Sequence, residues 1–290
     1  MVEARPNVHR RRFGAAMKQL REAAGLSLEE AATLLGLSGK PALSKIENGR
    51  QNLSGLALTG LFAVYGVDSE ETKATARAMA ALAAPGKLTN LVAQYGDSIQ
   101  TDSFADFLTL ESLAIRSTSF LQVIPGLLQT DEYATAVVES SGMWASEREV
   151  AAFVELRRAR KAVLTREDPL DLRCFLDEVA LRRVVGGPAV MSRQLDALLR
   201  AMDASSNVTL NVLPFGAGEH SALDGPFQLL EFPAGPPVVV VETKSTVAYF
   251  EEDRDVRYYR SALDDLSKRA LDTQASRRFI QELTKECHEE

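Results

Sequence analysis

The sequence predicts an α+β protein in two parts, an N-terminal all-α bundle over residues 1–68 and a C-terminal α+β domain over residues 105–290. Apolar residues recur at helical spacing through the first 68 residues, and the runs end at glycines. Clear alternation of apolar and polar residues, typical of strands with one covered face, appears from about residue 170. An Ala-rich stretch that ends at Pro85-Gly86 lies between them, so residues 69–104 are predicted as a helical linker.

The overall composition is that of an ordinary soluble globular protein, with 46% hydrophobic and 25% charged residues. The formal net charge of −7 argues against a nucleic-acid partner, but the charge is unevenly distributed. Residues 1–60 hold nine Lys or Arg against five Asp or Glu, a net of +4, which leaves −11 for the remainder. A basic head on an acidic body suits a DNA-binding module attached to a domain that does not touch DNA.

Several classes of protein are disfavoured by what the chain lacks. Its two cysteines, Cys174 and Cys287, and its three scattered histidines form neither a disulfide framework nor a metal-ligand spacing, and we expect no cofactor. The N-terminus has no apolar core of the kind that a signal peptide needs. No run approaches the roughly 18 apolar residues of a membrane-spanning helix. We therefore expect a cytoplasmic, nucleoid-associated protein without a membrane partner.

The most informative pattern lies in residues 26–50, which predict two short helices joined by a tight turn. Ser27 and Glu30 have the S-x-x-E spacing of a capping box, which begins the first helix. Gly36 ends that helix, since glycine tolerates a left-handed conformation, and Ser38 is placed to cap the second. This is the layout of a helix-turn-helix, whose second helix lies in the DNA major groove, although other small helical hairpins also carry a glycine turn.

The second helix of this pair predicts a face for DNA. Leu43 and Ile46 lie three residues apart and should face inward, so the polar positions between and beside them should face solvent. Arg12, in the basic start Arg10–Arg12 of the preceding helix, is either a phosphate contact or part of a solvated tip. We predict Lys40, Ala42, Ser44 and Lys45 near base edges, and Arg12, Ser38, Asn48, Arg50 and Gln51 on phosphates.

Two more helices complete the predicted bundle. One covers about residues 10–24 and should pack its apolar positions behind the helix pair. The other is capped by Ser54 and stops at Gly66, so the bundle of four or five helices ends near residue 68. Its expected core face consists of Leu58, Leu61, Phe62 and Tyr65.

Two segments of the N-terminal part match a known family. They are A-A-x-L-L-G-L-S at residues 31–38 and L-S-K-I-E-N-G-R at residues 43–50. On these residues the stretch resembles the helix-turn-helix of the Xre/Cro family of regulators. The resemblance implies double-stranded DNA as the partner. Because the N-terminal part is only mildly basic, we expect modest affinity per monomer and dependence on a homodimer. This chain has Leu28 where the family usually has a polar residue, and about one extra residue in the turn, which leaves open which side chains reach the bases.

After the Ala-rich stretch, helices are predicted over 87–95 and 103–115. A buried strand over 120–129, ended by the Pro125-Gly126 turn, then opens the α+β part of the C-terminal domain. Thr130 then caps a helix, and a long helix covers about residues 146–166. Closely spaced later strands favour antiparallel pairing, so the sheet should be mixed or antiparallel and flanked by helices. Further strands are predicted over 170–176, 207–214, 226–232, 237–242 and 246–250, and further helices over 178–184, 188–202, 253–271 and 273–288.

Catalytic chemistry is not expected in this domain. Glu219-His220-Ser221 offers a base next to a nucleophile, but adjacent residues rarely orient onto one another as a catalytic pair must. We interpret this segment as a polar surface loop. Asp177-Glu178 follows a strand and should start the next helix, where negative charge is favoured. Trp144, the single tryptophan, is expected in the core or an interface.

Several segments of this domain also match a known family. They include F-L-Q-V-I-P-G-L-L-Q-T-D-E-Y-A at 120–134, L-D-E-V-A-L-R-R at 176–183 and G-P-F-Q-L-L-E-F at 225–232, and the most distinctive piece is P-G-L-L-Q-T at 125–130. They resemble the uncharacterised C-terminal domain that follows an Xre-type helix-turn-helix in many actinobacterial regulators of development and antibiotic production. Such regulators are often encoded beside a small partner protein.

The resemblance implies a DNA-binding transcriptional regulator, which we expect to be a dimeric repressor-type reader. It leaves three roles open for the second domain: a sensor of an unknown small-molecule effector, a docking surface for a small protein partner, or a dimerisation body. The alternative function is an antitoxin-like interaction protein that holds a small partner and autoregulates its own operon.

Overall fold

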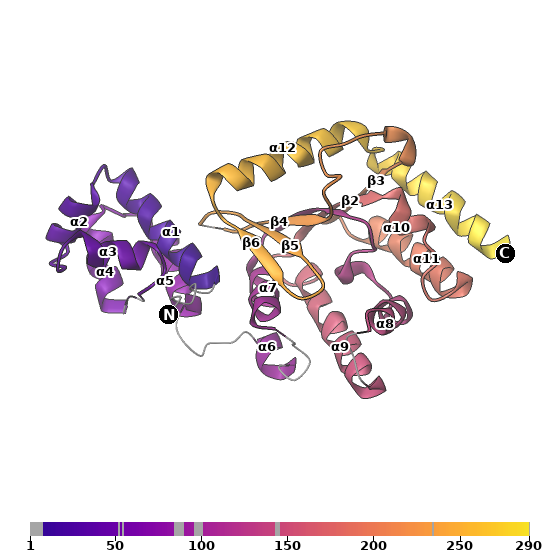
Figure 1. The fold of residues 1–290 in the computed structure, drawn as a ribbon, viewed down its shortest axis with the longest axis horizontal. Helices are drawn as coiled ribbons and strands as arrows, with labels where there is room; N and C mark the ends of the chain where they lie inside the picture. The colour runs from indigo at the N-terminus through magenta and orange to yellow at the C-terminus, as the bar shows by residue number, and fades with distance from the viewer. Residues whose placement is uncertain are drawn as a thin grey trace. The chain divides into compact units, whose positions relative to one another are not determined.

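The computed structural model describes residues 8–51, 53, 55–83, 90–95, 101–142, 146–233 and 235–289. They fall into two compact units that divide between residues 89 and 90, with the loop 232–237 grouped with the first unit. The first unit is helical and the second contains a mixed sheet flanked by helices, so the predicted α+β fold class is confirmed (Figure 1).

Five helices form the first unit: α1 (Val8–Ala23), α2 (Leu28–Leu34), α3 (Lys40–Glu47), α4 (Gly55–Val64) and α5 (Glu70–Ala83). Leu43 and Ile46 of α3 are buried, as the sequence predicted. They share one apolar core with Phe13 and Met17 of α1. The predicted core face of α4 is confirmed as well, since its members are all buried in that core: Leu58, Leu61, Phe62 and Tyr65.

Helix α5 comes from the Ala-rich segment that the sequence predicted as a spacer. Its Ala76, Met79 and Ala83 are buried in the same core as the helix-turn-helix. Residues 70–83 are therefore part of the helical bundle, while Pro85-Gly86 lies outside the described residues. The predicted domain boundaries themselves remain predictions.

The ends of the helix pair confirm most of the predicted capping. Ser27 Oγ accepts from Glu30 N at 3.3 Å, and Glu30 Oε2 accepts from Ser27 N at 2.9 Å, which is the capping box. Gly36 has a φ of +66° just beyond α2. The prediction for Ser38 as a cap was wrong, because α3 begins at Lys40 and its N-cap is Gly39, which has no side chain to bond the free amides. The predicted cap Ser54 lies outside the described residues.

The second unit is built on a six-stranded sheet in the order β3-β2-β1-β4-β5-β6. Helical crossovers join β1 to β2 and β2 to β3, and these two pairs are parallel. The later strands pair antiparallel, as their close spacing predicted. The strand bounds are β1 (Arg116–Leu121), β2 (Asp171–Asp177), β3 (Val208–Leu213), β4 (Phe227–Glu231), β5 (Val238–Glu242) and β6 (Val247–Phe250).

The first strand lies earlier than predicted. The sequence placed it over 120–129, whereas β1 ends at Leu121 and Gly126–Leu128 forms a 3₁₀ turn. Serines hid its buried face: Ser117 accepts from Gln228 Nε2 at 2.7 Å, and Ser119 Oγ donates to Cys174 Sγ at 3.5 Å. These hydrogen bonds allow polar residues to fill core positions that an apolar pattern would have revealed.

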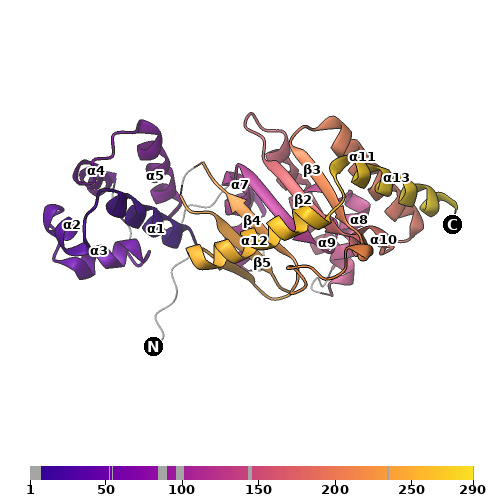
Figure 2. The same ribbon diagram turned by 90° about the horizontal axis from the view of Figure 1, so that it is seen from above.

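Helices cover both faces of the sheet. Figure 1 and Figure 2 show α12 along one face, with α7 and α9 on the opposite face. α11 and α13 pack on each other and on the edge strand β3. The bounds are α6 (Asn90–Tyr95), α7 (Asp102–Leu113), α8 (Asp131–Ser140), α9 (Glu147–Arg160), α10 (Glu178–Arg182), α11 (Pro188–Ala204), α12 (Asp253–Arg269) and α13 (Thr273–Glu289). Within the part of the chain described, no helix has the length and apolarity to span a membrane.

Candidate nucleic-acid interface

Helix α3 presents the outward face that its sequence predicted. Lys40 and Lys45 are exposed, and Ala42 and Ser44 are partly exposed. The face that α3 turns inward carries Leu43, Ile46 and Glu47, all buried. The four residues predicted near base edges therefore lie on accessible parts of one short helix.

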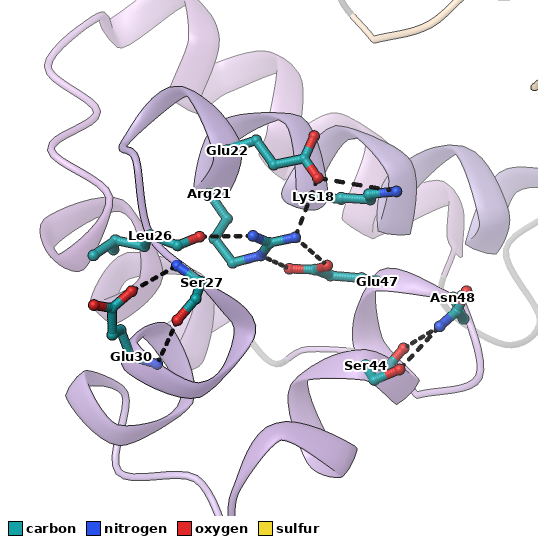
Figure 3. Close-up of polar contacts among 9 residues, drawn as sticks. All are labelled: Lys18, Arg21, Glu22, Leu26, Ser27, Glu30, Ser44, Glu47 and Asn48. Carbon is teal, nitrogen blue, oxygen red and sulfur yellow. Dashed lines mark hydrogen bonds and ion pairs between the residues drawn. The ribbon is translucent and has the colours of Figure 1, made fainter. Parts of the chain in front are cut away.

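A buried ion pair holds the inner side of α3 in place. Arg21 of α1 donates from Nε to Glu47 Oε1 at 2.7 Å and from Nη2 to Glu47 Oε2 at 3.1 Å (Figure 3). Its Nη1 donates to the Leu26 carbonyl at 2.7 Å. The side chains of Arg21 and Glu47 are 7% and 5% exposed. One guanidinium thus ties together α1, the approach to α2 and the last turn of α3, which fixes the angle at which α3 is presented.

The backbones of α1 and α3 also touch. A Cβ placed on Gly14 would lie 2.3 Å from the Glu47 carbonyl oxygen, closer than any real side chain can sit. Gly49, at a φ of +69°, follows α3, and a Cβ there would lie 2.7 Å from the Arg10 carbonyl. The sequence analysis predicted neither the close approach of α1 to α3 nor the Arg21–Glu47 pair. The signal available for the close approach was Gly14, a glycine inside an otherwise regular helix.

The residues after α3 hydrogen-bond back to α3, which the sequence did not predict. Asn48 Nδ2 donates to the Ser44 carbonyl at 2.8 Å and to Ser44 Oγ at 3.1 Å (Figure 3). The backbone amides of Arg50 and Gln51 both donate to the Lys45 carbonyl, at 2.7 and 3.2 Å. These amides therefore cap α3, and a phosphate contact at Arg50 or Gln51 would use the exposed side chains.

The remaining two predicted contacts differ from each other in accessibility. Ser38 is exposed in the turn before α3. Arg12 is only 3% exposed, so a phosphate contact by Arg12 would require its side chain to rearrange. The exposed members of the predicted set are Ser38, Lys40, Lys45, Asn48, Arg50 and Gln51.

In the second unit, the Glu219-His220-Ser221 segment does not form a nucleophile–base pair. Ser221 Oγ donates to Asp265 Oδ2 of α12 at 2.8 Å. His220 instead packs its ring against Phe120, with centroids 5.2 Å apart, and its Nδ1 accepts from Ala222 N at 3.2 Å. These contacts attach the loop to the domain, and the acceptor at the Ser221 hydroxyl is the Asp265 carboxylate and not the His220 imidazole. That the chain is not an enzyme stays a prediction.

Two acidic residues, at the end of β2 and the start of α10, have structural roles, as predicted. Asp177 is the N-cap of α10, where its side chain accepts from Val179 N at 2.9 Å. Glu178 Oε2 accepts from the amide of Phe215 at 2.7 Å and so joins α10 to the segment after β3. Over the described ranges, no group of three or more His, Cys, Asp or Glu residues is arranged to hold a metal ion. Trp144 lies outside those ranges.

Cys174 should be chemically inert in the folded chain. It is buried between strands, and burial raises the pKa of its thiol to about 12. Only the thiolate reacts with iodoacetamide, so at about pH 8 we expect alkylation of the partly exposed Cys287 and not of Cys174. Peptide mass spectrometry would measure this, with the urea-unfolded chain as the control in which both thiols react. Modification of Cys174 in the native chain would contradict the prediction.

Comparison with known protein families gives two matches. A helix-turn-helix domain matches residues 12–75, which contain α2 and α3. A family described as a domain of unknown function (DUF5753) matches residues 104–282, more than half of the chain. Neither curated proteins nor solved structures provide a match.

Proposed function

The chain belongs to the family of the domain of unknown function DUF5753, preceded by a helix-turn-helix domain, and we propose that it is a sequence-specific DNA-binding transcriptional regulator. The observation that carries this proposal is the division of α3 into a buried face and an accessible polar face. We further assign the helix-turn-helix to the Xre type and the protein to an actinobacterial repressor-type reader that acts on the chromosome. These finer assignments rest on the resemblance of residues 31–38, 43–50 and 120–134.

In the proposed complex α3 enters the major groove, where Lys40 and Lys45 reach base edges. The side chains of Arg50 and Gln51 lie just beyond α3 and contact phosphates. The buried Arg21–Glu47 pair supplies no DNA contact and instead holds α3 rigid, so that little conformational entropy is lost on binding.

A homodimer is part of the proposal. Residues 1–60 carry a net charge of only +4, so a single module should bind DNA weakly. Two modules on half-sites about 34–36 Å apart would combine their affinities. The second unit then serves as the regulatory body, through dimerisation and through binding of a ligand or a small protein partner.

Selection from a random duplex library with the full chain tests the proposal. One enriched motif with two related half-sites is expected, together with binding that weakens steeply as salt is raised in fluorescence anisotropy. Enrichment of no motif, or equal affinity for selected and scrambled duplexes, would refute sequence-specific binding.

Lys45→Ala should weaken binding to the selected duplex about tenfold, which is about 1.4 kcal/mol. The lysine is exposed on the accessible face of α3, so its removal should leave folding intact. Lys268→Ala is the matched control, because it removes the same charge from an exposed position on α12. Anisotropy with both variants measures the effect, and equal affinities of the two would remove Lys45 from the interface.

A further inference from the structure

Two adjoining cavities lie in the second unit, on the face of the sheet opposite α12. The smaller is about 300 Å³, and its lining includes Ser119 and Leu121 of β1 and the segment 123–127. The larger is about 600 Å³ and is lined from α7, α8, α9 and the β5–β6 turn. Both volumes are in the range of small-molecule sites. The two cavities share three lining residues, Val137, Arg157 and Glu242.

The larger cavity has walls suited to an aromatic body. Phe104 of α7 and Phe153 of α9 stack with ring centroids 5.8 Å apart. Val137 and Val138 of α8 and Val247 of β6 complete the apolar lining. A flat apolar ligand placed against these rings would bury its surface and gain stacking contacts.

Arg157 lines both cavities, and its guanidinium has an unusual set of hydrogen-bond partners. Its Nη1 donates to Gln129 Oε1, a neutral acceptor, while its Nε is buried without an acceptor among the described residues. Arg160, three residues further along α9, shows the ordinary arrangement, since its Nε and Nη2 each lie 2.8 Å from an oxygen of Glu111. No carboxylate in the described ranges forms such a pair with Arg157.

Electrostatics agree with this geometry. Burial, followed by the neighbouring Arg160, lowers the pKa of Arg157 to about 10. The charge of Glu242 opposes this shift, but Glu242 forms no ion pair with Arg157 in the part of the chain that the structure describes. An anion delivered by a ligand would give the partly buried guanidinium a hydrogen-bonded counterion. Glu242 also lines both cavities, so a dianion such as a phosphate would meet more repulsion there than a monoanion.

We propose that these cavities bind a small molecule with an aromatic body and a single carboxylate, the body against Phe104 and Phe153 and the carboxylate on Arg157. A role of this ligand as the effector of DNA binding rests on the proposed function. The binding itself can be measured without DNA, so a failure of one proposal is distinguishable from a failure of the other.

Isothermal titration of the full chain tests the site with 2-naphthoate as the probe. The neutral 2-naphthamide and the dianionic 2-naphthyl phosphate are titrated as matched comparison ligands. We expect saturable 1:1 binding of naphthoate, and at least about tenfold weaker binding of the amide and of the phosphate. Absence of saturable naphthoate binding, or equal binding of acid and amide, would overturn the proposal. Tighter binding of the phosphate would overturn the assignment of a carboxylate.

Two variants locate the probe. Arg157→Gln should weaken naphthoate binding about tenfold or more while leaving the weak amide binding unchanged. Arg158→Gln is the matched control, since this exposed neighbour pairs with Asp131 and its loss removes the same charge. Val137→Phe fills the shared wall, keeps Arg157 and should also block the probe, which tests the site without altering the cation. Wild-type affinity in either Arg157→Gln or Val137→Phe would place the probe elsewhere.

Discussion

Glu47→Gln should destabilise the packing of α3 against α1 by about 3 kcal/mol, since removing one partner of a buried ion pair leaves the other charge without its partner. The substituted amide keeps the shape of the carboxylate but removes its charge. Arg21 would then keep the Leu26 carbonyl, a neutral amide and the long contact to exposed Glu22 as its acceptors. The loss should appear first at α3, because Glu47 is its last residue.

Hydrogen–deuterium exchange of the full chain measures this effect, because it reports the opening of α3 separately from the second unit. Glu22→Gln is a matched control on the same guanidinium: Glu22 contacts Arg21 Nη2 at 3.4 Å, but its side chain is 54% exposed. An exposed pair of this kind contributes at most about 1 kcal/mol. Equal exchange of α3 in the two variants would show that the buried pair does not hold the helix.

Glu47→Gln should also weaken DNA binding, although Glu47 is buried and touches no DNA in the proposed complex. In part of the variant population α3 would be displaced and unable to bind DNA. The apparent affinity would fall in proportion to the fraction of molecules in which α3 keeps its native position. Glu22→Gln leaves α3 in place and should bind as the wild type does. This difference would separate the support of α3 from direct contact.

Local chemistry made most of the first unit predictable. A capping box requires two residues three positions apart, and Ser27 and Glu30 showed it directly. Leu43 and Ile46 revealed the inner face of α3 because helical periodicity places them together. The Arg21–Glu47 pair joins residues 26 positions apart, and nothing local to either residue indicates its partner.

The second unit divides in the same way. Strands β2 and β3 alternate apolar and polar residues and were located to within a residue or two, whereas the serines on the buried face of β1 broke that pattern. The cation at Arg157 was also hidden, because its buried Nε has no hydrogen-bond partner within the described residues, and only the folded chain can reveal this. Sequence periodicity reports which face is buried, and it does not report which polar groups meet there.

Gly14→Ala should destabilise the first unit by about 2–3 kcal/mol, the cost of forcing extra atoms into a packed contact. The added Cβ would lie 2.3 Å from the Glu47 carbonyl oxygen and 2.7 Å from the Ile46 carbonyl oxygen. Both are backbone atoms, so α1 and α3 must separate as whole helices. Alanine favours a helix over glycine by up to about 1 kcal/mol, which offsets only part of this cost.

Gly60→Ala makes the opposite prediction and serves as the control. Gly60 also lies inside a helix, but a Cβ there would meet nothing within 4 Å. Its replacement should therefore stabilise α4 by about 0.5–1 kcal/mol. Exchange measured over α3 and α4 in both variants should show faster opening after Gly14→Ala and slower opening after Gly60→Ala. The same sign of change in both would mean that helix propensity, and not the approach of α1 to α3, decides the stability of the unit that presents α3.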